Sequence, residues 1–298
     1  MDIYGFLIGN RSEILYLPGF DFTKSANIED CLLVKKLESG FISCIYEDEA
    51  DIYLGTSGYL PPEGIKKPKG YNPNLLCLRS GLEKSLHKGS SLENINDIKR
   101  IDNKIVIAGD RVFEDINGNS MLNERQRPYF NQKIISIIPC GSDYLLHIIT
   151  REGKSQIREY DSFEMEVGSK IMNLGVNNSK SDTYMTSPGI ISCCRGDYIL
   201  LEDKKIEGTM LRKHEYTEKY GALEIISEQP FLVAAAGIGL NRLILFEIDA
   251  GRCMTKLNMN LLKGLKSINL AISAVRHNSS HEWLMENSRK HDLFYNAF

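Results

Sequence analysis

The sequence has no long apolar run and no basic, apolar leader at its start. No window approaches the about 18 apolar residues that a membrane-spanning helix needs. The first residues, MDIYGFLIGNRSE, lack a positively charged segment, and their apolar stretch is too short for a signal peptide. We therefore expect neither a membrane partner nor a secretory leader.

Charge bias and a disulfide pattern are lacking as well. The 298 residues carry a formal net charge of −3, which gives no general reason to expect nucleic acid or an anionic membrane as the partner. The seven cysteines are an odd number without a repeated spacing, and this favours reduced thiols. We expect a cytoplasmic or nuclear protein.

The short motifs that mark many enzymes are also missing. The sequence has no Gly-rich phosphate loop between a strand and a helix, no Gly-x-Ser-x-Gly elbow and no His-Glu-x-x-His motif. His277 and His281 are four residues apart, but Asn278-Ser279-Ser280 between them predicts a turn rather than a helical metal-binding face. We expect no cofactor and favour a non-enzymatic role, while catalytic groups assembled only by the fold are compatible with the sequence.

What the sequence does contain is a series of short β-rich runs separated by turn residues. The clearest unit spans Leu223–Leu257. Its four predicted strands are Leu223–Ser227, Phe231–Ala236, Arg242–Ile248 and Cys253–Leu257, and glycines or Asp249-Ala250-Gly251 separate the last three. These spacings predict an antiparallel meander with tight turns.

Comparable units recur along the chain. Their first strands begin near residues 41, 96, 133, 189, 223 and 268, and the last unit is predicted as Asn269–Val275, Glu282–Met285 and Asp292–Tyr295. Further strands precede them at Ile3–Ile8, Glu13–Leu17 and Cys31–Leu37. A period of about 40 to 45 residues with four strands per unit is typical of β-propeller blades, which bury their faces by stacking around a channel. A pair of β-sandwiches or an α+β protein is the alternative.

We therefore predict an all-β fold with a single domain over residues 1–298. The domain is expected to be a seven-bladed β-propeller of four-stranded antiparallel blades. Because the last unit has only three predicted strands, the N-terminal segment Asp2–Ile8 is expected to supply the fourth and close the ring, which removes a free sheet edge.

Two segments resemble the third strand of a WD-repeat blade, which in that family ends in Trp-Asp. In Leu243–Cys253, Phe246 stands at the Trp position and Glu247 at the Asp position. Tyr160-Asp161 occupies the same two positions in the fourth unit. The resemblance implies a propeller that serves as a protein-protein interaction scaffold and as a subunit of a complex. Because the family's buried Trp-Asp-His network is mostly replaced, apolar packing must hold the blades together.

The insertion Tyr59–Asn74 is the main candidate for the contact surface. It contains four prolines, which remove backbone donors and exclude both a helix and a central strand. The predicted partner-binding residues are its aromatic and basic side chains, Tyr59, Lys66, Lys67, Lys69 and Tyr71. The polar connections Asn119–Gln132 and Val176–Pro188 are expected to add to this surface.

Acidic and amide side chains provide weaker candidates for a metal site. Asp115, Asn117, Asn119 and Asn123 place oxygens at alternate positions and resemble the calcium loops of integrin-type propeller blades. Because only Asp115 is charged, we expect an Asn-Gly turn and no bound metal. The acidic run Glu47-Asp48-Glu49 with Asp51 is expected to lie on an exposed turn.

Taken together, these features predict a non-enzymatic platform for protein-protein interaction within a larger intracellular assembly. Two alternatives are compatible with the sequence. One is a propeller hydrolase with its site at the mouth of the channel. The other is an RNA-binding propeller that uses the basic loops.

Overall fold

The computed structural model describes most of the chain. The described residues are 3–10, 12–19, 21, 23–37, 41–57, 74–85, 94–128, 130, 132–140, 142–176, 181–186, 189–194, 198–202, 212–215, 219–228, 231–238, 242–249, 253–265 and 270–290. For most residues between 171 and 260 the description covers the backbone alone.

The described strands form six β-sheets, which confirms the prediction of an all-β fold. Sheet 1 contains β5 (Phe41–Glu47), β6 (Ile52–Ser57), β7 (Asn74–Cys77) and β8 (Glu83–Ser85). Sheet 2 contains β9 (Ile95–Ile101), β10 (Lys104–Gly109) and β11 (Phe113–Asp115). Sheet 3 contains β12 (Lys133–Cys140), β13 (Asp143–Ile149), β14 (Lys154–Asp161) and β15 (Glu166–Val176).

The other three sheets come from the second half of the chain and its N-terminal segment. Sheet 4 contains β16 (Ser181–Thr186), β17 (Gly189–Cys194), β18 (Tyr198–Glu202) and β19 (Arg212–Glu215). Sheet 5 contains β20 (Lys219–Glu228), β21 (Phe231–Ile238), β22 (Arg242–Asp249) and β23 (Cys253–Lys263), with β3 (Ala26–Asn27) at its edge. Sheet 6 contains β24 (Leu270–Val275), β1 (Gly5–Asn10), β2 (Glu13–Pro18), β4 (Leu32–Lys36) and β25 (Arg289–Lys290). All described pairings are antiparallel except the short one between β23 and β3.

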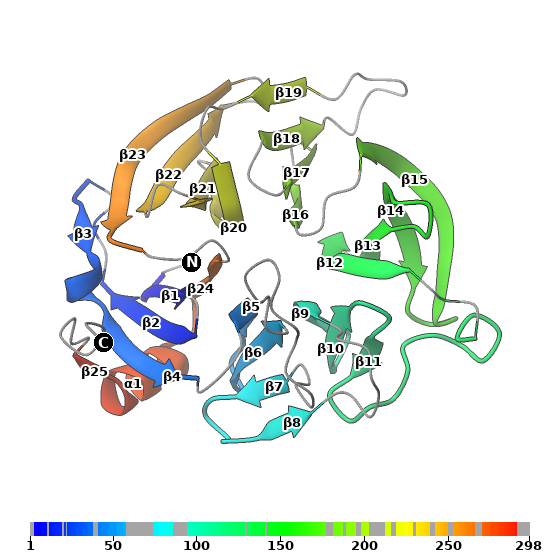
Figure 1. Ribbon diagram of the computed structural model, residues 1–298, viewed down its shortest axis with the longest axis horizontal. Helices are drawn as coiled ribbons and strands as arrows, with labels where there is room; N and C mark the ends of the chain where they lie inside the picture. The colour runs from blue at the N-terminus through cyan, green and yellow to red at the C-terminus, as the bar shows by residue number, and fades with distance from the viewer. Residues whose placement is uncertain are drawn as a thin grey trace, which may run out of the picture.

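The six sheets are arranged around a common centre, and the first strand of each lies nearest to it (Figure 1). Each of these inner strands contacts the inner strand of the next sheet. The contacts run from β5 to β9, β12, β16, β20 and β24, and β24 in turn contacts β5. The series of neighbouring sheets therefore returns to its starting point.

The described strands form six sheets, so the sequence prediction of seven blades is not confirmed. The N-terminal strands and the last unit were predicted as separate blades, but they form one sheet in the described chain. β1 pairs with β2 on one side and with β24 on the other, in a register that places Leu7 opposite both Tyr16 and Ser273. The N-terminal strand therefore pairs with the last long strand of the described chain, in sheet 6.

Apolar side chains on both faces of a strand explain why the sheets stack. Phe6 and Ile8 of β1 are fully buried and belong to a cluster with Leu243 and Leu245 of sheet 5. Leu7, between them, points to the other face and packs with residues of sheet 1. Successive side chains of a strand alternate between faces, so each sheet needs a neighbour on both sides.

Two further expectations are corrected by the described elements. Glu282–Met285 was predicted as a strand but lies in helix α1 (Asn278–Asn287). The connection Val176–Pro188 contains β16, which is the inner strand of sheet 4. The predicted strand Asp292–Tyr295 lies outside the described residues. In the part of the chain that the structure describes, no helix is long and apolar enough to cross a membrane.

Candidate functional site

The predicted partner-binding residues lie outside the part of the chain that the structure describes. They are Tyr59, Lys66, Lys67, Lys69 and Tyr71. Their role therefore stays a prediction. The described chain offers four other places where polar or exposed side chains could bind a ligand or partner. They are a pocket between the inner strands, the acidic β5–β6 turn, the Asp115 turn and the β14–β15 turn.

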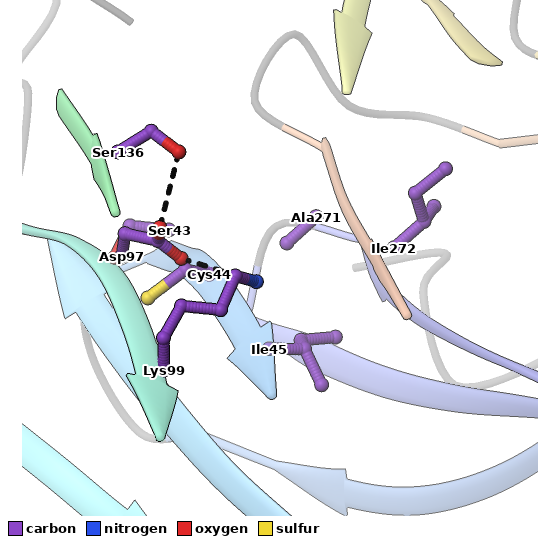
Figure 2. A pocket seen from close by; sticks show the side chains of 8 residues that line it. All are labelled: Ser43, Cys44, Ile45, Asp97, Lys99, Ser136, Ala271 and Ile272. Atoms are coloured by element: carbon purple, nitrogen blue, oxygen red, sulfur yellow. Dashed lines mark hydrogen bonds and ion pairs between the residues drawn. The ribbon is translucent and has the colours of Figure 1, made fainter. Parts of the chain in front are cut away.

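A small pocket lies between inner strands of sheets 1, 2, 3 and 6. Figure 2 shows its polar side chains on one side and Ala271 with Ile272 across from them. The lining residues are Ser43, Cys44, Ile45, Asp97, Lys99, Ser136, Ala271 and Ile272. Polar groups at such a position could bind a ligand or could join neighbouring sheets. Their hydrogen bonds show which of these two roles they have.

Asp97 uses its carboxylate to connect neighbouring inner strands. Its Oδ2 accepts hydrogen bonds from the Ile137 backbone N–H at 2.8 Å and from Ser136 Oγ at 3.1 Å, both on β12. Lys99 Nζ lies 3.4 Å from Asp97 Oδ1 on the same strand. Asn96 makes a parallel link, because its Nδ2 donates to the Ile134 carbonyl at 2.7 Å. These side chains hold β9 to β12, which is a structural use of the only carboxylate in the pocket lining.

The acidic run at the β5–β6 turn was expected to be exposed; this holds for Glu49 but is wrong for its other three carboxylates. Glu47, Asp48 and Asp51 are all buried. Asp48 pairs with Arg100 of β9, so it joins sheet 1 to sheet 2. Asp51 accepts hydrogen bonds from the backbone N–H groups of Ile52, Arg79 and Ser80 and so shapes the turn after β7.

Glu47 binds the beginning of helix α1, about 230 residues away in the sequence. Its carboxylate accepts hydrogen bonds from the backbone N–H groups of Arg276 at 3.1 Å and His277 at 3.3 Å. His277 Nδ1 lies 2.9 Å from Glu47 Oε1. A carboxylate at this position satisfies free donors at a helix N-terminus and interacts favourably with the helix dipole.

Asn278-Ser279-Ser280 begins helix α1, so the prediction of a turn between His277 and His281 is corrected: His277 is the N-cap residue and His281 lies within the helix. They have different partners: His277 faces Glu47, and His281 Nδ1 lies 2.6 Å from Tyr16 Oη. Tyr4 stacks on the His281 ring with centroids 5.3 Å apart. Burial and the Glu47 charge raise the pKa of Tyr16, which stays a neutral phenol. Both imidazoles therefore fasten the helix to the sheets.

A further ion pair joins sheet 6 to sheet 5. Arg276 Nη2 lies 3.3 Å from Glu224 Oε1 of β20. Burial raises the pKa of Glu224, while the positive charges of Arg276 and Lys99 oppose this rise. Charged side chains thus connect neighbouring sheets at several points around the centre.

The calcium-like segment forms a turn in which Asp115 binds backbone and amide groups. Asp115 Oδ1 accepts hydrogen bonds from the backbone N–H groups of Asn117 at 2.8 Å and Asn119 at 2.9 Å, and Oδ2 accepts one from Asn119 Nδ2. Gly118 has φ +90°, a backbone conformation that favours glycine. Asn123, the fourth candidate ligand, instead accepts a bond from the Gln126 backbone N–H. Among the described residues, no group of three or more acidic, histidine or cysteine side chains could hold a metal.

The β14–β15 turn is the place that sequence reasoning missed. Phe163 at its tip is 95% exposed. Asp161 Oδ1 accepts hydrogen bonds from the backbone N–H groups of Phe163 at 2.8 Å and Glu164 at 2.9 Å, which fixes the turn. The available signal was an aspartate followed two residues later by an aromatic residue between acidic ones, a pattern that predicts a turn but not its role.

The connection Asn119–Gln132, which was expected to contribute to the contact surface, makes hydrogen bonds to the backbone of this turn. The Asn123 backbone N–H donates to the Met165 carbonyl at 2.9 Å, and Asn123 Nδ2 donates to the Glu164 carbonyl. The side-chain amide of Gln126 binds both the N–H and the carbonyl of Val167, as a neighbouring strand would.

Both pairs of residues that resemble the WD-repeat motif lie in the third strand of a sheet, but only Tyr160-Asp161 ends its strand. Tyr160-Asp161 ends β14 and Phe246-Glu247 lies in β22, each the third strand of its sheet. Tyr160 is buried, and its hydroxyl donates to the Met121 carbonyl at 2.7 Å. Its ring contacts Phe113 edge-on. The tyrosine therefore anchors the strand that carries the Phe163 turn.

Comparison with known proteins gives a distant structural likeness. No family model matches the sequence, and no curated protein matches it. Among solved structures, the chain is similar to the β-propeller domain of Cps50 (Swd1) from Myceliophteria thermophila. The identity is 12%, the TM-score is 0.44, and the similarity covers 86% of this chain and 87% of that one.

Proposed function

We propose that the chain is a single WD-repeat-like propeller domain that acts as a non-enzymatic platform for binding other proteins. In this proposal the six sheets are its blades, and the pairing of β1 with β24 closes the ring. The platform belongs to a multi-subunit assembly in the cytoplasm or the nucleus. The contact surface includes the predicted loop residues Tyr59, Lys66, Lys67, Lys69 and Tyr71.

The observation that carries this proposal is the use of buried or largely buried carboxylates to join sheets. Asp48 with Arg100 links sheets 1 and 2, Asp97 with Ser136 links sheets 2 and 3, and Arg276 with Glu224 links sheets 6 and 5. Buried polar networks whose members are bonded to one another make a fold rigid. A rigid frame can present variable turns and loops to partners without a change in its core.

A binding role also fits the chemistry at the centre of the ring better than hydrolysis does. A general base needs a free lone pair near the substrate, and a catalytic carboxylate usually has one oxygen available. In the pocket, Oδ2 of Asp97 accepts two hydrogen bonds from β12, and Oδ1 faces the Ile98 backbone N–H and Lys99. The carboxylate is therefore occupied in holding the inner strands.

Native co-purification tests the platform. The full chain, affinity-tagged and expressed in its own cells, is isolated at low salt and analysed by light scattering after gel filtration. A mass well above that of one chain, with another protein present in constant ratio, is the expected result. Elution as a lone monomer would contradict the proposal. Co-eluting RNA that dissociates steeply with added salt would instead favour the RNA-binding alternative.

A further inference from the structure

The β14–β15 turn presents an aromatic side chain that the fold does not use. Phe163 is 95% exposed, whereas Tyr160, three residues earlier, is buried in the core between sheets 2 and 3. Two other large apolar side chains of the described residues are exposed, Leu82 and Met285, and each is only about half exposed, at 48% and 47%. A nearly fully exposed phenylalanine gives the folded chain no packing energy.

The turn is held in one shape before any partner arrives. Asp161 binds two backbone N–H groups within the turn. Asn123 and Gln126 bind backbone groups of the residues that follow Phe163, which are Glu164, Met165 and Val167. Met165 has φ +55°, a conformation that a non-glycine residue keeps only when its surroundings impose it. Binding to a preformed turn avoids the entropic cost of ordering it.

The surroundings of Phe163 are acidic. Residues 159–166 contain four carboxylates, Glu159, Asp161, Glu164 and Glu166, and no lysine or arginine. The supporting segment 123–128 adds Glu124, Arg125 and Arg127. These two segments together carry five acidic and two basic side chains. Such a surface repels phosphate backbones and anionic lipid headgroups, so it disfavours nucleic acid and membrane as the occupant.

We propose that the Phe163 turn is a docking anchor for a partner protein that has an apolar pocket bordered by lysine and arginine side chains. The proposal rests on the proposed platform function and names one contact surface of that platform. Exposed aromatic residues that enter a pocket are typical interaction hot spots, and complementary charges at the rim guide association.

Site-specific photocrosslinking identifies what the turn touches. The full chain carries benzoylphenylalanine at position 163, or at Leu82 as the matched control, and is irradiated in its own cells. The protein that co-purifies in constant ratio with the wild-type chain is expected to crosslink from position 163 and not from position 82. The crosslinked partner is then purified and used as the probe in binding measurements.

Variants of the turn measure how much each part contributes. Phe163→Ala is expected to weaken binding of the crosslinked protein by about 30-fold, as for a hot spot, while Leu82→Ala leaves it unchanged. Glu164→Lys is expected to weaken binding by about 5-fold at low salt, and less at high salt. Both turn variants should keep the wild-type unfolding temperature, because neither side chain contributes to the core.

The outcomes separate this inference from the platform itself. If no protein co-purifies with the wild-type chain, the platform proposal fails. If a partner co-purifies equally well with Phe163→Ala and does not crosslink at 163, only the docking anchor is wrong. Tighter binding by Glu164→Lys would contradict a basic rim. Phe163-dependent binding to phosphatidylserine vesicles, or Phe163-dependent self-association of the purified chain, would overturn the choice of occupant.

Discussion

His147 shows how one buried side chain can make the stability of the fold depend on pH. It is completely buried in β13, and its Nε2 lies 2.5 Å from Ser155 Oγ of the neighbouring strand. Burial lowers the pKa of His147 to about 4 from an ordinary value of 6.5. The folded protein therefore keeps this imidazole neutral at pH values where the unfolded chain binds a proton.

We predict that acidification destabilises the protein through this residue. Between pH 6.5 and about 4 the unfolded state gains a proton that the folded state resists, so stability falls as the pH falls through this window. Across this window His147 is expected to lower the free energy of unfolding by up to about 3 kcal/mol. Urea unfolding at pH 7, 6, 5 and 4 measures it. In His147→Gln this part of the pH dependence should vanish, and parallel losses in the variant and the wild type would refute the assignment.

At the scale of elements, helix α1 depends on a contact that no local sequence pattern reveals. His277, at its N-cap position, has no side-chain cap of its own. Glu47, the last residue of β5, instead accepts hydrogen bonds from the backbone N–H groups of Arg276 and His277. Only 1% of the Glu47 side chain is exposed. The helix and sheet 1 are therefore joined by one buried carboxylate.

Removal of the charge on Glu47 should loosen the helix. We expect Glu47→Gln to lower the free energy of unfolding by about 2 kcal/mol, because an amide cannot replace all three hydrogen bonds that the carboxylate accepts. Hydrogen exchange of the amides in 276–287 should become faster. Glu49→Gln, an exposed carboxylate in the same turn, is the control and should change neither value. Unchanged exchange in Glu47→Gln would show that the helix docks without this contact.

The strands could be predicted because their signals are local. In β21, the apolar run from Phe231 ends at glycines, and sheet 5 has the four strands that these spacings predicted. Helix α1 was missed because Asn278-Ser279-Ser280 favours a turn until Glu47 caps it from a distant turn. β16 was missed because its sequence, SDTYMT, has no apolar run. Its place as an inner strand depends on contacts with β12 and β20.

The candidate site was less predictable than the fold for the same reason. The Asp115 and Asp161 turns were recognisable as turns, because an aspartate that accepts backbone N–H groups is a local motif. The exposure of Phe163 depends on Asn123 and Gln126, which approach from another part of the chain. The burial of Glu47 and Asp48 likewise depends on His277 and Arg100. Sequence patterns alone do not contain these distant contacts.

At the scale of the whole molecule, the pairing of β1 with β24 makes the two ends of the chain part of one sheet. In an open row of repeats, each unit interacts only with its neighbours, so a mutation in a terminal unit destabilises only the adjacent unit. Here sheet 6 contacts sheet 1 through β24 and β5, and sheet 5 through β24 and β20. Unfolding of sheet 6 therefore removes packing contacts from both sheet 1 and sheet 5.

We predict that a proline in β1 destabilises sheets that it does not touch. Ile8 lies in the middle of sheet 6, between β2 and β24, so Ile8→Pro removes a backbone donor from a central strand and should cost more than about 3 kcal/mol. If the six sheets unfold as one unit, hydrogen exchange should become faster in β13 of the distant sheet 3 as well as in β2, and the free energy of opening should fall by the same amount in both strands. Ser169→Pro is the control, because Ser169 is exposed, has no partner in the β14–β15 register and lies on the outermost strand of its sheet. Rapid exchange confined to sheets 5, 6 and 1 would show that the sheets unfold independently and that the pairing of β1 with β24 does not couple them.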